Sequence, residues 1–388
     1  MGAMKRGLGY EIQGVLCGGS LATSDIVKEV GCRYKEGYNK LNELEHLGLV
    51  KSNIDGKKRI WHLTLEPPYA NHAVNNGFSE CFSKLPNNGL KVTFDHNERV
   101  EKISDGSIIT IFNKTPPNII CPHFLELKWA NGCHYNCAWC YLQGTFRFRG
   151  KKAYVKDPEK ISNHLFTFLQ TKTPDILNAG ELSDSLSDPN IYYIIRAFES
   201  QKRHKLLLLT KSCSIAPLLK IEKPTNTVVS FSVNSSKVAE RWETGAPYPE
   251  NRLDAAQLLH ERGYPIRFRI DPIVPYPERW ETYYKDLIDD IFMRFPPERI
   301  TLGTLRGLQS TISHCKDDSW VEYLNEKSGW GLKQKFYTRF NIYSTLLEYL
   351  IDKYNFYDVG ICKETREMWE FLKPFGLDLE NIKCNCTW

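Results

Sequence analysis

Short apolar runs alternate with longer helical patterns through the middle of the chain, from about residue 120 to residue 316. Six of these runs are rich in Leu, Ile, Val and Phe, and each predicts a β-strand: residues 124–127, 175–178, 206–210, 228–233, 266–271 and 300–303. Strands that alternate with helices form parallel sheets. Six units suit an open, partial (β/α)6 barrel of the α/β class better than a closed one of eight, with functional loops at the carboxyl ends of the strands.

The first 68 residues have a different pattern. Apolar and aromatic side chains recur at helical spacing at Tyr34, Tyr38, Leu41, Leu44 and Leu47, after two shorter helical patterns. Thr23, Ser24 and Asp25 could cap the second of these helices. Two strand-like segments then follow around the turn at Asp55-Gly56. The succession resembles a winged helix-turn-helix domain, which could contact nucleic acid through its third helix and basic wing or could dock a protein or peptide.

Two further regions flank the predicted barrel. Residues 69–119 are polar with short alternating segments, and they predict a small β-rich linker. After the last strand, an amphipathic helix is expected over about residues 336–353, within a C-terminal helical region that also carries cysteines. The pattern therefore divides the chain into four parts: residues 1–68, 69–119, 120–316 and 317–388.

Composition narrows the class of protein. The 388 residues are 41% hydrophobic, which is enough for more than one core. No run of about 18 apolar residues and no secretory signal is visible, so we expect a cytoplasmic protein without a membrane partner. The net charge of +5 permits an anionic partner without requiring one. Twelve cysteines in such a chain favour metal or redox use over disulfides.

Cys133, Cys137 and Cys140 lie on one predicted loop, directly after the first strand candidate. Three thiolates so close together can bind one metal centre, because soft sulfur ligands suit iron-sulfur clusters and zinc. A structural zinc site normally has four protein ligands, whereas three cysteines leave one iron of a [4Fe-4S] cluster open. His134 could be a fourth zinc ligand, but its place in the same turn would strain the coordination.

The C-x3-C-x2-C spacing, the following Tyr141 and the preceding strand resemble the signature of the radical S-adenosylmethionine (SAM) superfamily. The resemblance implies that the open iron binds SAM and that one electron from the cluster cleaves SAM to methionine and a 5'-deoxyadenosyl radical. It also implies an electron donor such as a flavodoxin or ferredoxin.

Further segments resemble spore photoproduct lyase and its relatives over roughly residues 120–290. They follow successive strand candidates, at residues 178–184, 209–211, 231–234, 251–256, 263–265 and 270–273. The resemblance implies that six residues hold SAM: Ser183, Asp184, Lys211, Ser232, Asn234 and Asp271. Lys211 would face the methionyl carboxylate, as a point-charge cation can, and the segment with Asp271 would lie beside the adenine. Taken singly, such side chains could also cap a helix, lie in solvent or bond to the backbone.

The resemblance fails at the hydrogen-atom donor. In the lyases a cysteine gives the hydrogen atom and tyrosines relay the radical, but here Glu181 stands at the cysteine position and Trp139 replaces one tyrosine. Tyr141, Glu181 and Cys213 are therefore the candidate catalytic residues. Cys213 could act as a substitute donor or be a small buried hydrophobic side chain. Glu181 could bind the ammonium group of SAM, bind a polar substrate or act as a general base.

A second group of cysteines lies near the end of the chain. The Cys384-Asn385-Cys386 pair and the upstream Cys362 could supply most of an auxiliary iron-sulfur or zinc site. Three residues could complete that site: Cys121, His314 and Cys315. Unpaired structural cysteines are the alternative.

Aromatic and basic residues are mixed at residues 146–152, just beyond the three-cysteine loop. Such a strip could follow a phosphate backbone while its rings stack on bases, or it could be a solvated strand face.

The leading hypothesis is a radical SAM enzyme that abstracts hydrogen from DNA or RNA, for repair or modification, with the winged helix recruiting the nucleic acid. In this hypothesis the protein positions the substrate and the cofactor supplies the difficult chemistry. One alternative keeps the chemistry and makes the substrate a peptide or protein that the winged helix recruits. A second alternative is a non-catalytic redox sensor and DNA-binding regulator, which would not cleave SAM.

Overall fold

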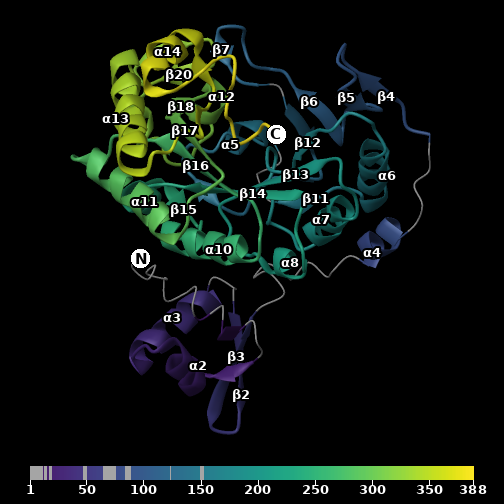
Figure 1. The fold of residues 1–388 in the computed structure, drawn as a ribbon, viewed down its shortest axis with the longest axis vertical. Helices are drawn as coiled ribbons and strands as arrows, with labels where there is room; N and C mark the ends of the chain where they lie inside the picture. The colour runs from purple at the N-terminus through teal and green to yellow at the C-terminus, as the bar shows by residue number, and fades with distance from the viewer. Residues whose placement is uncertain are drawn as a thin grey trace.

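The structure, a computed structural model, describes residues 12, 15–16, 20–46, 50–63, 76–83, 89–122, 124–148 and 153–388. A small N-terminal body lies below a larger α/β body (Figure 1). None of the described helices combines the length and the apolar character that crossing a membrane requires.

A ten-stranded sheet organises the larger body, in the order β21-β17-β16-β14-β13-β12-β8-β6-β5-β4. The strands from β8 to β21 pair in parallel: β8 (Phe124–Leu127), β12 (Ile176–Asn178), β13 (Lys205–Thr210), β14 (Thr227–Val233), β16 (Ile266–Ile273), β17 (Arg299–Thr304) and β21 (Val359–Ile361). The first six of them overlap the six segments that the apolar runs predicted.

Helices return the chain between the parallel strands, because each parallel connection must cross from one end of the sheet to the other. They are α6 (Pro158–Leu169), α7 (Ile191–Glu199), α8 (Ala216–Leu219), α9 (Ser236–Trp242), α10 (Pro249–Glu261), α11 (Trp280–Arg294) and α13 (Phe336–Tyr354). In α7, Ile191, Ile194, Ile195 and Phe198 are buried, which is the spacing of one helix face against the sheet. α13 confirms the amphipathic helix expected over residues 336–353.

Three antiparallel strands extend the sheet beyond β8, namely β4 (Val92–Phe94), β5 (Val100–Ile103) and β6 (Ile109–Phe112). Ile111 of β6 lies opposite Leu125 of β8. The polar region that predicted a β-rich linker therefore forms strands of the main sheet. The helix α4 (Asn76–Ser83) packs Phe78 and Phe82 near Tyr193 of α7.

The C-terminal region is not only helical. Its strand β21 extends the parallel sheet, and β22 (Glu364–Thr365) pairs with β7 (Ile119–Ile120) close to the first barrel strand. A small sheet has the order β18-β20-β19. The remaining short elements are β9 (Ala130–Asn131), β10 (Asn136–Cys137), α5 (Leu142–Thr145), β11 (Tyr154–Val155), β15 (Glu243–Thr244), β18 (Arg306–Gly307), α12 (Gln309–Ile312), η1 (Val321–Tyr323), β19 (Glu326–Ser328), β20 (Gly331–Lys333), α14 (Arg366–Phe371) and η2 (Lys373–Phe375).

The N-terminal body contains β1 (Leu21–Ala22), α2 (Thr23–Val30), α3 (Tyr34–His46), β2 (Val50–Asp55) and β3 (Lys58–Leu63), with an antiparallel sheet in the order β1-β3-β2. Gly56, at φ +58°, makes the turn between β2 and β3. The expected capping of α2 is wrong: Ala22 is the N-cap and makes no side-chain cap bond. The Thr23 hydroxyl instead accepts a hydrogen bond from the buried Trp61 indole at 2.8 Å. Most of the first predicted helix, and Leu47, lie outside the described residues.

Candidate active site

A cavity of about 480 Å³ opens where the parallel strands of the larger body end. Its wall includes Glu126 of β8, Thr210 at the end of β13, Ser232 of β14 and Asp271 of β16. The carboxyl ends of parallel strands are where ligand sites form in such sheets, because the connecting loops converge there.

The three-cysteine loop forms one side of this cavity, and Cys133, Cys137 and Cys140 all line it. Pairing of β10 with β15 sets Cys137 opposite Glu243. The Gln143 amide closes the loop by donating to the carbonyls of Cys137 and Ala138, at 3.0 and 2.9 Å. Burial raises the pKa of Cys137 to about 12. The loop therefore presents three sulfur atoms to one cavity.

The described residues include no group of three or more His, Cys, Asp or Glu side chains arranged to hold a single metal ion. A cubane cluster makes a different demand, because each cysteine binds a different iron. The donor set of the loop thus suits a multi-iron cluster.

Ser183 and Asp184 lie on the loop after β12, beside the cysteines. Gly132 N–H donates to the Leu182 carbonyl at 2.8 Å, which holds the two loops together. The Ser183 hydroxyl is buried and has no hydrogen-bond partner among the described residues. Asp184 accepts from the Thr210 hydroxyl and from Lys211 N–H, each at 2.7 Å. Ser183 therefore has a hydroxyl available for a ligand, while Asp184 supports the loop.

Lys211 lines the cavity and is tethered to Glu243, a residue that sequence reasoning missed. Its ammonium lies 2.7 Å from one Glu243 carboxylate oxygen, and the guanidinium of the fully buried Arg252 lies 2.6 Å from the other. Burial would raise the pKa of Glu243, but Arg252 and Lys211 together lower it to about 2. The carboxylate thus stays charged and fixes the direction of the Lys211 side chain.

Ser232 lies near the end of β14 and Asn234 comes directly after the strand, but only Ser232 lines the cavity. The Asn234 amide donates to the Pro272 carbonyl at 2.8 Å, and its oxygen accepts from the Tyr284 hydroxyl at 2.8 Å and from Ser235 N–H at 2.9 Å. These bonds join β14 to its neighbours, and the ligand contact expected of Asn234 stays a prediction.

Asp271 faces the cavity within a cluster of charges that the sequence did not reveal. Arg306 binds it through two nitrogens, at 3.1 and 2.9 Å, and Arg269 lies 3.4 Å away. Burial opposes ionisation, yet these two guanidinium groups lower the pKa of Asp271 to about 2. A side chain at Gly303 would place its Cβ 2.5 Å from Asp271 Cγ, so glycine leaves the room that this carboxylate occupies.

The candidate catalytic residues separate into two groups. Tyr141 and Glu181 both line the cavity, and the Tyr141 hydroxyl donates to the Glu181 carbonyl. Asn178 Nδ2 donates to the Glu181 carboxylate at 3.3 Å. Cys213, in contrast, is 1% exposed and is not among the cavity residues. Burial raises its pKa. This placement agrees with the buried hydrophobic alternative for Cys213, and its role as a hydrogen donor stays a prediction.

The outer wall of the cavity mixes aromatic rings with cations: Phe112, Lys114, Lys128, Trp330 and Lys363. The Lys363 ammonium lies 4.5 Å from the centroid of the Phe112 ring and 5.2 Å from the Trp330 ring. Sequence reasoning missed this wall because its members lie on strands and loops that are far apart along the chain.

The C-terminal cysteines gather next to this site. Cys384 and Cys386 form a buried cluster with Phe124, and Cys121 packs against it. Arg269 links Cys386 to Cys362, which is also buried. The other two candidates for this group have local contacts: the Cys315 thiol donates to the Ile312 carbonyl at 3.2 Å, and His314 Nδ1 lies 2.9 Å from the Ser310 carbonyl.

Comparison with known proteins gives a consistent result. A family model described as spore photoproduct lyase matches residues 124–306. The spore photoproduct lyase of Bacillus subtilis (strain 168) is 26% identical over 181 residues, which cover 44% of this chain and 52% of the relative. That of Geobacillus sp. (strain Y412MC61) is 25% identical over 267 residues, with coverages of 63% and 71%. The chain spans about half the length of the Bacillus subtilis relative and of a Clostridium acetobutylicum one.

Solved structures show the same fold. A spore photoproduct lyase variant with bound AdoMet and dinucleoside spore photoproduct has a TM-score of 0.53 at 18% identity, and the match covers 64% of this chain and 78% of that chain. A spore photoproduct lyase complexed with dinucleoside spore photoproduct has a TM-score of 0.52 at the same identity and coverage.

Over residues 124–306 the chain is similar in sequence to the spore photoproduct lyases, and its larger body shares their fold. The similarity supports a radical SAM protein resembling spore photoproduct lyase, and the activity of this chain is taken up below as a proposal. The matched residues 124–306 include the three-cysteine loop, Ser183, Lys211 and Asp271, and they exclude Phe112, Lys114, Trp330 and Lys363. Of the outer wall, only Lys128 lies within the matched residues.

Proposed function

We propose that this protein is a radical SAM enzyme that abstracts hydrogen from a nucleic-acid substrate. One observation carries the proposal: three cysteine sulfurs, the Ser183 hydroxyl and the Lys211 ammonium surround a single cavity at the strand ends.

The residues around the cavity fit the implied cofactors. Cys133, Cys137 and Cys140 would hold a [4Fe-4S] cluster, and Ser183 and Lys211 would bind the polar groups of SAM. The bound pair supplies reductive cleavage of SAM, which yields a radical able to take a hydrogen atom from a substrate.

The remaining residues position the ligand and the substrate. Glu243 orients the ammonium of Lys211, because it is charged and held by Arg252. Asp271 remains a carboxylate and can accept a hydrogen bond from a ligand. Glu181 offers a second acceptor at the position where the lyases have their cysteine, so we do not propose lyase-type turnover through that position.

The outer wall of the cavity supports nucleic acid as the substrate class. Phe112 and Trp330 offer rings for base stacking, and Lys114, Lys128 and Lys363 offer charge for phosphates. Beyond α5, the Phe148 side chain is 86% exposed, and the Arg147 guanidinium lies 4.5 Å from its ring centroid. The rest of that mixed strip, residues 149–152, lies outside the described residues. Bound dinucleoside spore photoproduct in the related structures agrees with this substrate class.

We infer that the N-terminal body is a winged helix that recruits the substrate. Lys51, Lys57 and Lys58 are exposed on its β2–β3 hairpin, where a wing would contact phosphates. Ile54 on the same hairpin is 80% exposed, and this apolar side chain favours the alternative of a recruited peptide or protein.

The first test is anaerobic reconstitution of the full chain with iron and sulfide, followed by addition of a reductant and SAM. We expect a brown protein that releases 5'-deoxyadenosine, and we expect the Cys137→Ala variant to lose this release. A colourless zinc protein, or an iron protein that does not cleave SAM, would contradict the enzyme proposal and favour the regulator.

To identify the substrate class, DNA, RNA or peptide is added separately with deuterium-labelled SAM, and exchange of deuterium with the added polymer is measured. Deuterium exchange with DNA or RNA supports the proposal, and exchange with peptide alone supports the alternative.

A further inference from the structure

Four cysteines from three separate segments meet behind the floor of the cavity: Cys121, Cys362, Cys384 and Cys386. In the β7–β22 pair, Ile120 lies opposite Glu364, which brings Cys121 next to the segment that contains Cys362. Cys121 also packs against the cluster of Cys384, Cys386 and Phe124. Cys362 N–H donates to the Leu302 carbonyl at 2.8 Å, at the end of β21.

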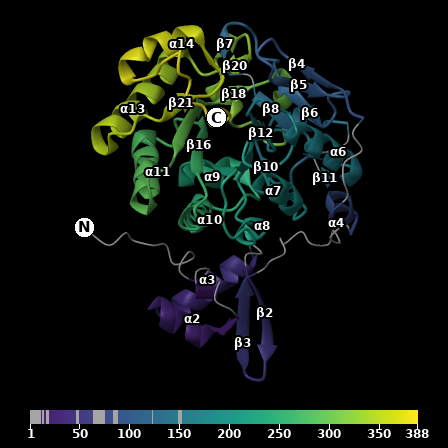
Figure 2. The ribbon, with the colours of Figure 1, turned by 45° about the vertical axis from the view of Figure 1, so that its right-hand side comes forward.

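The C-terminal segment that carries two of these cysteines is firmly anchored inside the larger body. The Asn385 amide donates to the Ser230 hydroxyl at 2.8 Å and to the Phe268 carbonyl at 2.9 Å. Arg267 donates to the Asn385 carbonyl at 2.7 Å. The C-terminus accordingly lies among the strands of the sheet in two views (Figures 1 and 2). Cys384 and Cys386 flank Asn385 and are therefore held in place.

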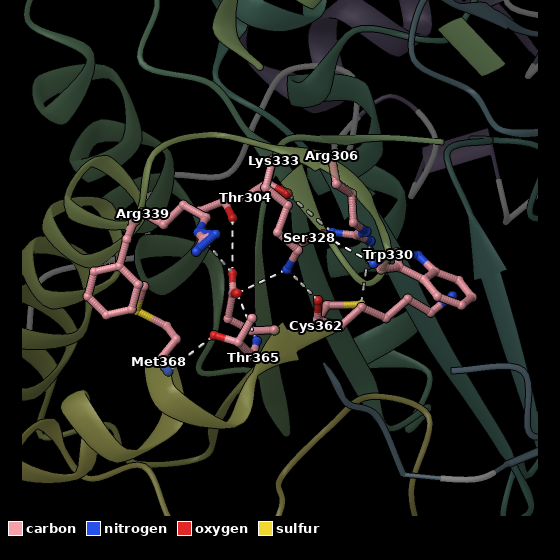
Figure 3. Close-up of polar contacts among 12 residues, drawn as sticks. Thr304, Arg306, Ser328, Trp330, Lys333, Arg339, Cys362, Thr365 and Met368 are labelled. Atoms are coloured by element: carbon pink, nitrogen blue, oxygen red, sulfur yellow. Dashed lines mark hydrogen bonds and ion pairs between the residues drawn. The ribbon is translucent and has the colours of Figure 1, made fainter. Parts of the chain in front are cut away.

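Two largely buried guanidinium groups face the thiols. Arg269 donates through one nitrogen to Cys362 Sγ at 3.3 Å and through the other to Cys386 Sγ at 3.2 Å. Arg306 approaches Cys362 Sγ at 3.6 Å, a contact visible in Figure 3. Asp271 supplies one negative charge for these two buried cations, and neutral thiols supply none.

We propose that Cys121, Cys362, Cys384 and Cys386 bind a second [4Fe-4S] cluster. Four thiolates are a complete ligand set for such a cluster. The oxidised cluster with four thiolates carries negative charge, and Arg269 and Arg306, which also face Asp271, would lie directly against it. The sequence left the fourth ligand open among Cys121, His314 and Cys315, and the packing favours Cys121.

The second cluster lies directly behind the cavity of the proposed reaction. Arg269 and Arg306 contact the thiols on one side and Asp271 of the cavity wall on the other. Loading the site would therefore fix the positions of two cavity residues. The inference does not depend on which substrate the enzyme takes.

Iron analysis of the anaerobically reconstituted full chain tests the proposal. We expect about eight iron atoms per chain, falling to about four in the Cys384→Ser/Cys386→Ser variant. The matched control is Cys315→Ser, which changes a cysteine whose thiol donates to the Ile312 carbonyl, and this variant should keep about eight iron atoms. An unchanged iron content in the double variant, or zinc in place of iron at this site, would overturn the proposal.

The Cys384→Ser/Cys386→Ser variant could lose iron because it misfolds, so a second variant tests the same site independently. The Cys133→Ala/Cys137→Ala/Cys140→Ala variant should keep about four iron atoms with the electron paramagnetic resonance signal of a reduced cluster. Loss of all iron from this variant would refute the second site. A wild-type chain with about eight iron atoms that leaves SAM intact would instead refute the proposed function and leave this inference standing.

Discussion

At the scale of single residues, two buried carboxylates of the candidate site stay ionised because cationic side chains pair with them. Glu243 lies between Lys211 and Arg252, and Asp271 lies between Arg306 and Arg269. In each case the pKa falls to about 2 although burial opposes it. Such paired charges keep the side chains in one orientation, and removing one partner leaves an uncompensated buried charge.

Asp271 makes the stability of the metal-free protein depend on pH. Its pKa of about 2 in the folded state lies below the ordinary value of 3.8, so its contribution is present above about pH 4 and is lost as the pH falls through about 2. We expect the free energy of unfolding to fall by about 2 kcal/mol from this group over that range. Urea unfolding at stepped pH measures it.

Asp271→Asn should show a smaller fall over the same range, while the control Asp352→Asn, at an exposed position of α13, should behave like the wild type. An Asp271→Asn variant with the same pH slope as the wild type would count against this assignment.

At the scale of elements, the close approach of two neighbouring strands positions the Asp271 carboxylate. β16 and β17 pair in parallel, and Gly303 of β17 lies against the Asp271 carboxylate of β16. The contact lets Asp271 reach Arg306 at the start of β18. The Asp271 carboxylate in the cavity wall thus depends on the missing side chain at Gly303.

Gly303→Ala should therefore destabilise the protein by about 1–3 kcal/mol, because the new methyl group overlaps Asp271. Thermal or urea unfolding measures the change. Gly89→Ala is the matched control, since nothing lies within 4 Å of its Cβ position, and it should change stability little. Equal stability of the two variants would show that the strands can shift to make room.

Two bodies contribute to the proposed recognition of nucleic acid at the scale of the whole molecule. The β2–β3 hairpin belongs to the small body below the sheet, and the cavity belongs to the larger one (Figure 1). Lys40 of α3 donates to Asn251 of α10 at 3.0 Å, which connects the two. A polymeric substrate could contact both bodies, whereas a small molecule would contact only the cavity.

Binding of a single-stranded oligonucleotide should weaken steeply with salt if phosphates are contacted. The Lys57→Gln/Lys58→Gln variant should lower the slope of log K against log salt by about 1.4, because each phosphate contact with a single strand contributes about 0.7. Lys202→Gln/Lys223→Gln, two exposed lysines at the amino ends of β13 and β14, is the control and should leave the slope unchanged. Fluorescence anisotropy measures the binding of the oligonucleotide at each salt concentration. No binding at low salt would favour a peptide or protein partner.

Local patterns in the sequence determined the six barrel strands, helix α13 and the three-cysteine loop, because apolar periodicity and close cysteine spacing are properties of neighbouring residues. Only the tertiary structure decided that Glu243 holds Lys211, that Asn234 and Cys213 lie outside the cavity, and that Cys121 packs beside Cys384. These relations join residues far apart along the chain, and strand pairing and side-chain packing alone bring them together. The same reason explains why the polar segment before residue 119 joined the main sheet, where β8 offered an edge to pair with.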